Sequence, residues 1–156
     1  MRLADHIAAW QKELKPPTKI QQSEGVYRLL VDQQWLLCLE AIEEEGCFFL
    51  FSSVCEIPKQ GEVEALRSAL SGNLFGKETG DAVLALHLDT DLLILFRRFE
   101  EATLRHEELM QGVQEFISLL RHWKEKIQRK SLKESVALQT HFQNYEQPDA
   151  MKIFFA

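Results

Sequence analysis

The chain has 156 residues, of which 46% are hydrophobic and 27% charged, and its formal net charge at pH 7 is -6. This composition suits one folded domain with a sizeable core, and it excludes intrinsic disorder, collagen and coiled coil as descriptions of the whole chain. The acidic excess also argues against a general nucleic acid binder, because that affinity comes from clustered Lys and Arg.

The N-terminal residues predict a short amphipathic helix over 2–15. Apolar residues recur there at the spacing of one helical face. They are Leu3, Ile7, Trp10 and Leu14. Pro16 and Pro17 end the helix, because neither proline supplies a backbone donor. Charged residues interrupt the stretch early, so we do not expect a secretory signal, and no apolar run in the chain is long enough to insert into a membrane.

A polar linker over 18–24 leads to three strands joined by short turns, which is typical of an antiparallel meander. The strands are expected at 26–31, 35–42 and 47–57. The second and third are apolar almost throughout, so both of their faces need cover from helices or from another chain. Their cysteines, Cys38, Cys47 and Cys55, lack a C-x-x-C spacing. We interpret them as small buried side chains in a reducing compartment rather than as disulfide or metal sites.

The second half of the chain predicts a helix, two strands and a long helix. Their expected bounds are 62–75, 82–88, 92–97 and 101–129. Glu100 and Glu101 would favour the start of the last helix through its macrodipole. The element order α-β-β-β-α-β-β-α indicates an α+β fold with an antiparallel sheet of about five strands and three helices. Residues 1–130 form the expected domain, and 131–156 form a polar, aperiodic tail with the apolar tip Ile153, Phe154 and Phe155.

No motif for catalysis, a cofactor or a metal is recognisable. The segment from Ser71 to Glu78 resembles a phosphate-binding loop, but these two end residues stand where Gly and Ser or Thr are required. Asp89 and Asp91 favour a hairpin turn over a cation site, because apolar residues follow them. The five histidines have no metal-ligand spacing. We therefore expect a protein that is not an enzyme and that holds no metal or cofactor.

The stretch from Arg121 to Lys133 is strongly basic, with six basic residues and one acidic residue. A solvated helix end that complements the dipole is the favoured interpretation. Contact with nucleic acid or with an anionic partner is the alternative.

Several segments taken in order resemble the Tir chaperone (CesT) family, the small acidic class I chaperones of bacterial type III secretion. The resemblance rests on the amphipathic first helix and its prolines, the strand start at Gly25-Val26, Asn73-Leu74-Phe75-Gly76, the strand from Ala82, the Asp-bearing turn, and Arg97-Arg98 before the long helix. It covers about residues 2–130.

The resemblance implies a homodimer in the bacterial cytoplasm. Such a protein binds the N-terminal chaperone-binding segment of one or more secreted effectors, keeps it extended, and delivers it to the secretion apparatus without catalysis. The secretion ATPase is a further candidate partner. Dimer contacts in the family lie on the second helix and the strand after it. In this chain they correspond to Leu66, Leu70, Leu74, Phe75, Leu84, Leu86 and Leu88.

Apolar patches on the first helix and the sheet are the expected effector site, since an added strand gives affinity and side-chain pockets give selectivity. The candidates are Leu3, Ile7, Trp10, Trp35, Leu37, Leu39, Phe49 and Phe51. Each has an ordinary core role as its alternative. Trp35 is favoured for binding, because Trp often anchors a partner. A small ligand-binding enzyme and a regulatory adaptor that uses the basic helix end are the competing functions.

Overall fold

The computed structural model describes residues 1–15 and 18–132, and the tail predicted from the sequence lies outside them from residue 133 onward. The helices in this part of the chain are α1 (Leu3–Glu13), α2 (Glu62–Asn73) and α3 (His106–Leu132). The strands are β1 (Gln21–Ser23), β2 (Val26–Val31), β3 (Trp35–Ile42), β4 (Cys47–Glu56), β5 (Val83–His87) and β6 (Leu92–Glu100). Short 3-10 turns lie at η1 (Glu43–Glu45), η2 (Leu74–Gly76) and η3 (Leu88–Thr90).

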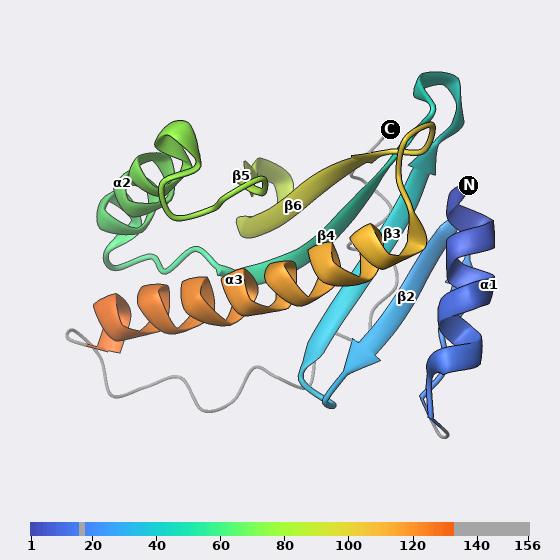
Figure 1. Ribbon diagram of the computed structural model, residues 1–156. Coiled ribbons are helices and arrows are strands. Elements are labelled where there is room, and N and C mark those ends of the chain that lie inside the picture. Colours follow the sequence, from blue (N-terminus) through green and yellow to red (C-terminus); the bar gives the residue numbers. More distant parts are fainter. Residues whose placement is uncertain (16–17, 133–156) are drawn as a thin grey trace.

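The strands form one antiparallel sheet in the order β1-β2-β3-β4-β6-β5 (Figure 1). The predicted α+β class and the three helices are confirmed. The sheet has one strand more than the sequence indicated, because β1 lies in the segment interpreted as a linker. All three residues of β1 are exposed, so it carries no apolar alternation and is held through its pairing with β2.

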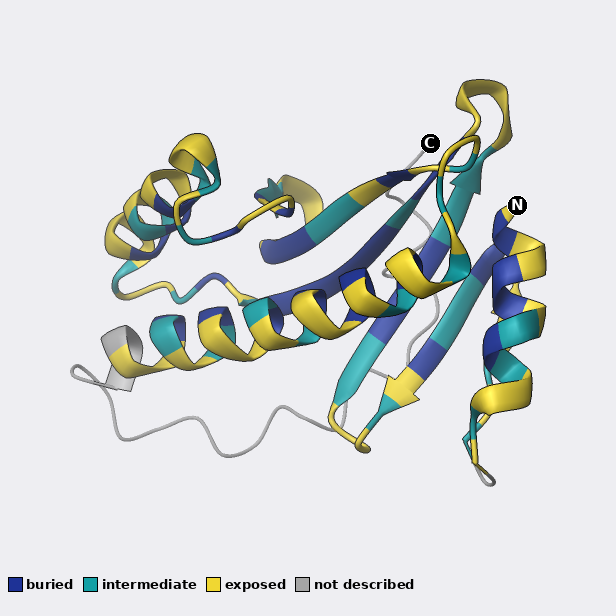
Figure 2. Cartoon of the chain, in the orientation of Figure 1, coloured by how far each residue is buried: buried dark blue, intermediate teal, exposed yellow. Residues whose placement is uncertain are grey.

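The three helices pack on one face of the sheet (Figure 1), where they enclose the main core. The apolar stripe of α3 contributes its largest side chains, including Trp123 and Phe116, to the same core as Phe48 from β4. Figure 2 shows the result as a buried stripe on α3 toward the sheet and exposed residues on its outer side. No described helix is apolar over a length that would cross a bilayer.

The opposite face of the sheet carries a second, smaller cluster to which no described helix contributes. Its buried members come from four strands and are Val26, Cys38, Phe51, Leu92 and Ile94. We call this face the helix-free face, with reference to the described residues. Strands β3 and β4 are apolar on both faces because they contribute to both clusters, as their sequences predicted.

The start of the last helix differs from the prediction. Strand β6 continues to Glu100, a turn follows, and α3 begins only at His106 with Glu107 and Glu108 in its first turn. Glu100 and Glu101 therefore do not complement the helix dipole. The Glu101 carboxylate instead accepts a hydrogen bond of 2.7 Å from the backbone N–H of Leu3, which ties the start of α1 to the end of β6.

Candidate protein-binding surfaces

An exposed apolar surface lies on α2, η2 and the neighbouring β5 segment. Phe75 is 98% exposed, Leu88 76%, Leu70 70% and Leu74 58%. Val63 and Val83 are also exposed, although the sequence analysis did not single them out. Single exposed apolar residues are ordinary, but several large ones on adjacent elements are typical of a protein contact. We call these six residues the α2–β5 surface.

The backbone at Phe75 is strained as well as exposed. Its φ is 53°, in the left-handed region that residues with a Cβ rarely adopt. Such a conformation costs of the order of 1 kcal/mol and persists only where the surrounding structure holds it. The ring gains little burial in return within this chain, so the turn presents Phe75 outward.

Asn73 holds this turn against the sheet. Its Nδ2 donates a hydrogen bond of 2.8 Å to the carbonyl oxygen of Leu84, and its Oδ1 accepts one of 2.9 Å from the N–H of Leu84. The side-chain amide thereby pairs with β5 as a neighbouring strand would. Asn73 fixes the end of α2, and with it the positions of Leu74 and Phe75.

The other predicted dimer residues are less accessible. Leu84 is buried in the main core, and Leu66 and Leu86 are half-buried and pack against it. Leu84 and Leu86 alternate onto the helix-covered face of β5, opposite Leu95 and Leu93 of β6. Leu84 was predicted to contribute to the dimer contact, but its side chain is already buried in the main core and leaves almost no free surface for a second copy.

An apolar pocket of about 260 Å³ opens among β4, β6 and β5, mostly on the helix-free face. It is lined by Phe49, Phe51, Ala85, Leu86, His87, Ile94 and Phe96. The rings of Phe49 and Phe96 meet edge to face with their centroids 5.8 Å apart. Phe49 and Phe51 were predicted from the sequence as binding residues, whereas their neighbours on β6 and β5 were not predicted to bind an effector. Those residues join the pocket only through the strand order β4-β6-β5, which the sequence pattern does not reveal.

The remaining effector candidates lie elsewhere. Five of them are buried in the main core, namely Leu3, Ile7, Trp10, Leu37 and Leu39. Leu3, Ile7 and Trp10 offer no open patch, because the apolar stripe of α1 packs into the main core. Leu37 and Leu39 lie on β3 and belong to the same core. Trp35 is half-buried on the same helix-covered face, under α3 rather than beside the pocket.

Chemically active groups do not converge on either surface. The described residues contain no cluster of three or more His, Cys, Asp or Glu side chains that could hold a metal. Burial raises the pKa of the Cys38 and Cys55 thiols to about 12, so neither is an activated nucleophile. The buried His6 stacks on His106 with their Nδ1 atoms 3.4 Å apart, and burial lowers the pKa of His6. This pair joins α1 to α3.

The sequence model of the Tir chaperone protein (CesT) family matches residues 16–124. The chain belongs to the CesT family. No curated protein is similar enough in sequence to count as a relative.

Solved structures share the fold of this CesT family member at low sequence identity. A chain of the ExsC-ExsE complex superposes with a TM-score of 0.66 at 18% identity, covering 81% of this chain and 97% of that one. A chain of the HopA1-SchA chaperone-effector complex gives 0.59 at 17%, covering 79% and 90%. A chain of the heterodimeric ExoU-SpcU complex from the type III secretion system of Pseudomonas aeruginosa gives 0.57 at 17%, covering 82% and 96%.

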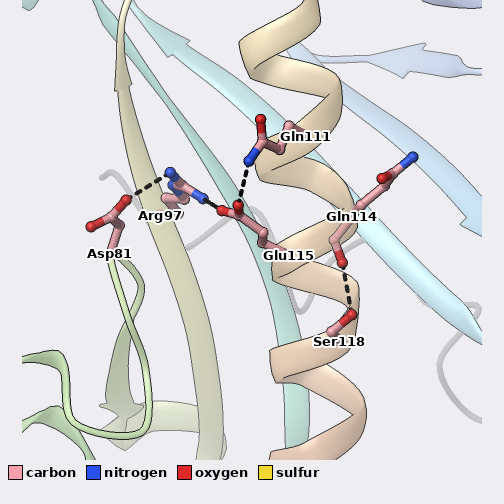
Figure 3. Close-up of polar contacts among 6 residues, drawn as sticks. All are labelled: Asp81, Arg97, Gln111, Gln114, Glu115 and Ser118. Carbon is pink, nitrogen blue, oxygen red and sulfur yellow. Dashed lines mark hydrogen bonds and ion pairs between the residues drawn. The ribbon is translucent and has the colours of Figure 1, made fainter.

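The arginine pair that contributed to the resemblance has a structural role in this family member. Arg97 bridges Asp81 before β5 and Glu115 on α3 through ion pairs of 2.8 and 2.9 Å (Figure 3). Glu115 also accepts a hydrogen bond from Gln111, and these donors lower its pKa. Arg98 faces the other way and pairs with Glu45 and Glu100. The two arginines thereby form ion pairs on the two sides of β6.

Proposed function

We propose that this chain is a non-catalytic chaperone of bacterial type III secretion, active in the cytoplasm as a homodimer. It binds the N-terminal segment of one or more effector proteins, keeps it extended, and delivers it to the secretion apparatus. Residues up to about 130 carry this function. The observation that carries the proposal is the apolar pocket at the helix-free face of a chain that belongs to a chaperone family.

The α2–β5 surface is proposed as the contact between two copies. It combines exposed Leu and Val side chains with a ring, Phe75, that is held outward at a backbone cost. A stable interface needs roughly 800 Å² from each partner with a buried apolar centre. Leu70, Leu74 and Phe75 would supply that centre, and Leu88 would extend it along the edge of the sheet. Leu66 and Leu86 would be covered at its inner border.

The pocket is proposed as an anchoring point for an effector segment. Phe49 and Phe51 keep the role predicted for them, and Ile94 and Phe96 are added to it. The pocket admits an apolar side chain, which would supply selectivity along an otherwise extended segment. The solved complexes that share this fold include structures described as chaperone with effector, which supports the proposal.

The absence of catalysis is also part of the proposal. Its support is that the pocket is lined almost wholly by apolar side chains, with His87 the one titratable group in the lining. An enzyme site needs several polar groups that converge on a reacting atom.

Co-expression tests the proposed function. The chain would be produced with a tagged product of an adjacent reading frame, since chaperones of this family are often encoded beside their cargo. The expected result is that the N-terminal segment of that product becomes soluble and co-purifies with the chain, in a ratio of two copies of the chain to one. The proposal would be overturned if the chain made none of the neighbouring products soluble. It would also be overturned if the chain turned over a substrate.

A further inference from the structure

Two basic side chains of α3 converge on one aromatic ring at the start of β3. The Nζ atom of Lys124 lies 5.0 Å from the centroid of the Trp35 ring, and Cζ of Arg121 lies 5.9 Å from it. Both distances are within the range of a cation–π contact. The three residues lie on the helix-covered side of the sheet, so they are separate from the pocket and from the proposed effector site.

Neither cation has a carboxylate partner among the residues that the structure describes. Other basic side chains of the chain do, since Lys126 pairs with Glu78, Arg129 with Glu125, and Arg97 with Glu115. Arg121 and Lys124 bring two positive charges to one aromatic ring of a chain whose net charge is -6. They mark a local positive site on an acidic protein.

Lys124 is also partly removed from water. Burial is the main cause that lowers the pKa of its ammonium group. The Cys55 thiol is the nearby titratable group, and its own pKa is raised to about 12, so it stays uncharged and does not neutralise Lys124. A partly desolvated charge without a counter-ion is costly, and an arriving carboxylate relieves that cost.

We propose that Trp35, Arg121 and Lys124 form a docking site for an acidic segment of a protein partner. The exposed Arg121 guanidinium donates hydrogen bonds to the first carboxylate, the Lys124 ammonium group donates to a second, and the Trp35 ring holds both cations in place. The negative charge of the rest of the chain repels acidic segments elsewhere, which restricts them to this site. A nucleic acid fits less well, because its affinity grows with the number of phosphates contacted and only two unpaired cations stand here.

Titration with acetylated hexaglutamate amide tests this site on the full chain. The signal is the Trp35 indole N–H in heteronuclear NMR spectra, assigned by its loss in Trp35→Phe. The test variant is Arg121→Gln with Lys124→Met, in which the methylene stem of Lys124 is largely kept. The control is Arg129→Gln with Lys59→Gln, which changes the net charge equally at two exposed positions away from the Trp35 ring. Melting temperatures establish that both variants fold.

The expected result is a saturable shift of the Trp35 signal, with affinity weakened at least about tenfold in the test variant and less than about twofold in the control. Equal weakening in both variants would mean general charge attraction and would overturn the proposal. It would also be overturned by the absence of any Trp35 shift, or by a decathymidylate that binds through the same residues more tightly than hexaglutamate. The site does not rest on the proposed effector pocket, so Phe49→Ala is expected to leave hexaglutamate binding unchanged.

Discussion

A methyl group added at Gly72 would lie 2.3 Å from Cζ2 of Trp123. The indole is fully buried and fixed, because its Nε1–H donates a hydrogen bond of 3.1 Å to the carbonyl of Glu78. The missing side chain at this position therefore lets α2 approach α3 closely. This approach sets where the end of α2, and hence the α2–β5 surface, stands relative to the core.

Replacing Gly72 by Ala is expected to lower the free energy of unfolding by roughly 1–3 kcal/mol, because the buried Trp123 ring cannot move aside without repacking. Chemical denaturation monitored by tryptophan fluorescence measures the loss. Ser71→Ala, at the preceding exposed position of the same helix, is the control and should change stability little. If Gly72→Ala were as stable as the wild type, α2 and α3 could move apart without a loss in the free energy of unfolding, and the close approach would not matter for stability.

Placing carboxylates on the α2–β5 surface is expected to separate the proposed dimer. Leu70→Asp with Phe75→Asp would bury unpaired charges at the contact, while both positions are exposed in the single chain and tolerate the change there. Light scattering coupled to size exclusion measures the mass. Leu30→Asp, an exposed leucine on β2, is the matched control and should remain dimeric. A double variant that still elutes as a dimer would disprove this interface.

Loss of the Asn73 amide is expected to release the turn that carries Phe75. Asn73→Ala removes both hydrogen bonds to Leu84, each worth about 0.5–1.5 kcal/mol net. Hydrogen exchange at the Leu84 amide should accelerate, while amides within β4 and β6 keep their protection. The proposed dimer should also be weaker and dissociate at a higher protein concentration than the wild type, because Phe75 is no longer held outward. Unchanged exchange at Leu84 would mean that Asn73 does not hold the strand.

Truncation in the pocket is expected to weaken capture of an effector segment without affecting the dimer. Phe49→Ala removes the ring that meets Phe96, and an anchor of this kind is worth about 2 kcal/mol or more, a loss of roughly thirtyfold in affinity. Isothermal titration with the captured segment measures it. Leu30→Ala lies on the same face of the sheet but outside the pocket, so it serves as the control. Equal affinities for both variants would remove the pocket from the site.

The His6–His106 pair predicts a loss of stability in mild acid. The pKa of His6 is lowered from 6.5 by burial and by His106 and the N-terminal amine, against the opposing effect of Asp5 and Glu101. The folded state binds the proton of His6 less well than the unfolded state does. The contribution of His6 to the free energy of unfolding is therefore complete above pH 6.5 and is lost as the pH falls below that value. Melting temperatures between pH 7.5 and 5.5 should therefore decline. The decline should shrink in His6→Gln and persist in His122→Gln.

Much of the fold follows from local patterns. The strands β2 and β3 begin and end where their apolar runs and the turn residues predict, and α1 and α2 match their apolar spacing closely. β1 was not predicted from the sequence, because Gln21–Ser23 is exposed and contributes only backbone pairing with β2. The start of α3 was misplaced since acidic residues at 100 and 101 are equally compatible with a strand end.

The candidate site was also predictable only in part from the sequence. Composition and element order are properties of the chain itself, and they were enough to indicate the class of fold, the lack of catalytic motifs and the resemblance to a chaperone family. Which apolar residues are available to a partner depends on what covers them. Trp10 and Leu39 are as apolar as Leu70 and Phe75, yet the first two are buried in the main core and nothing described covers the other two. Only the packing of helices on one face of the sheet, and the order β4-β6-β5, decided which side chains form the core and which form a surface.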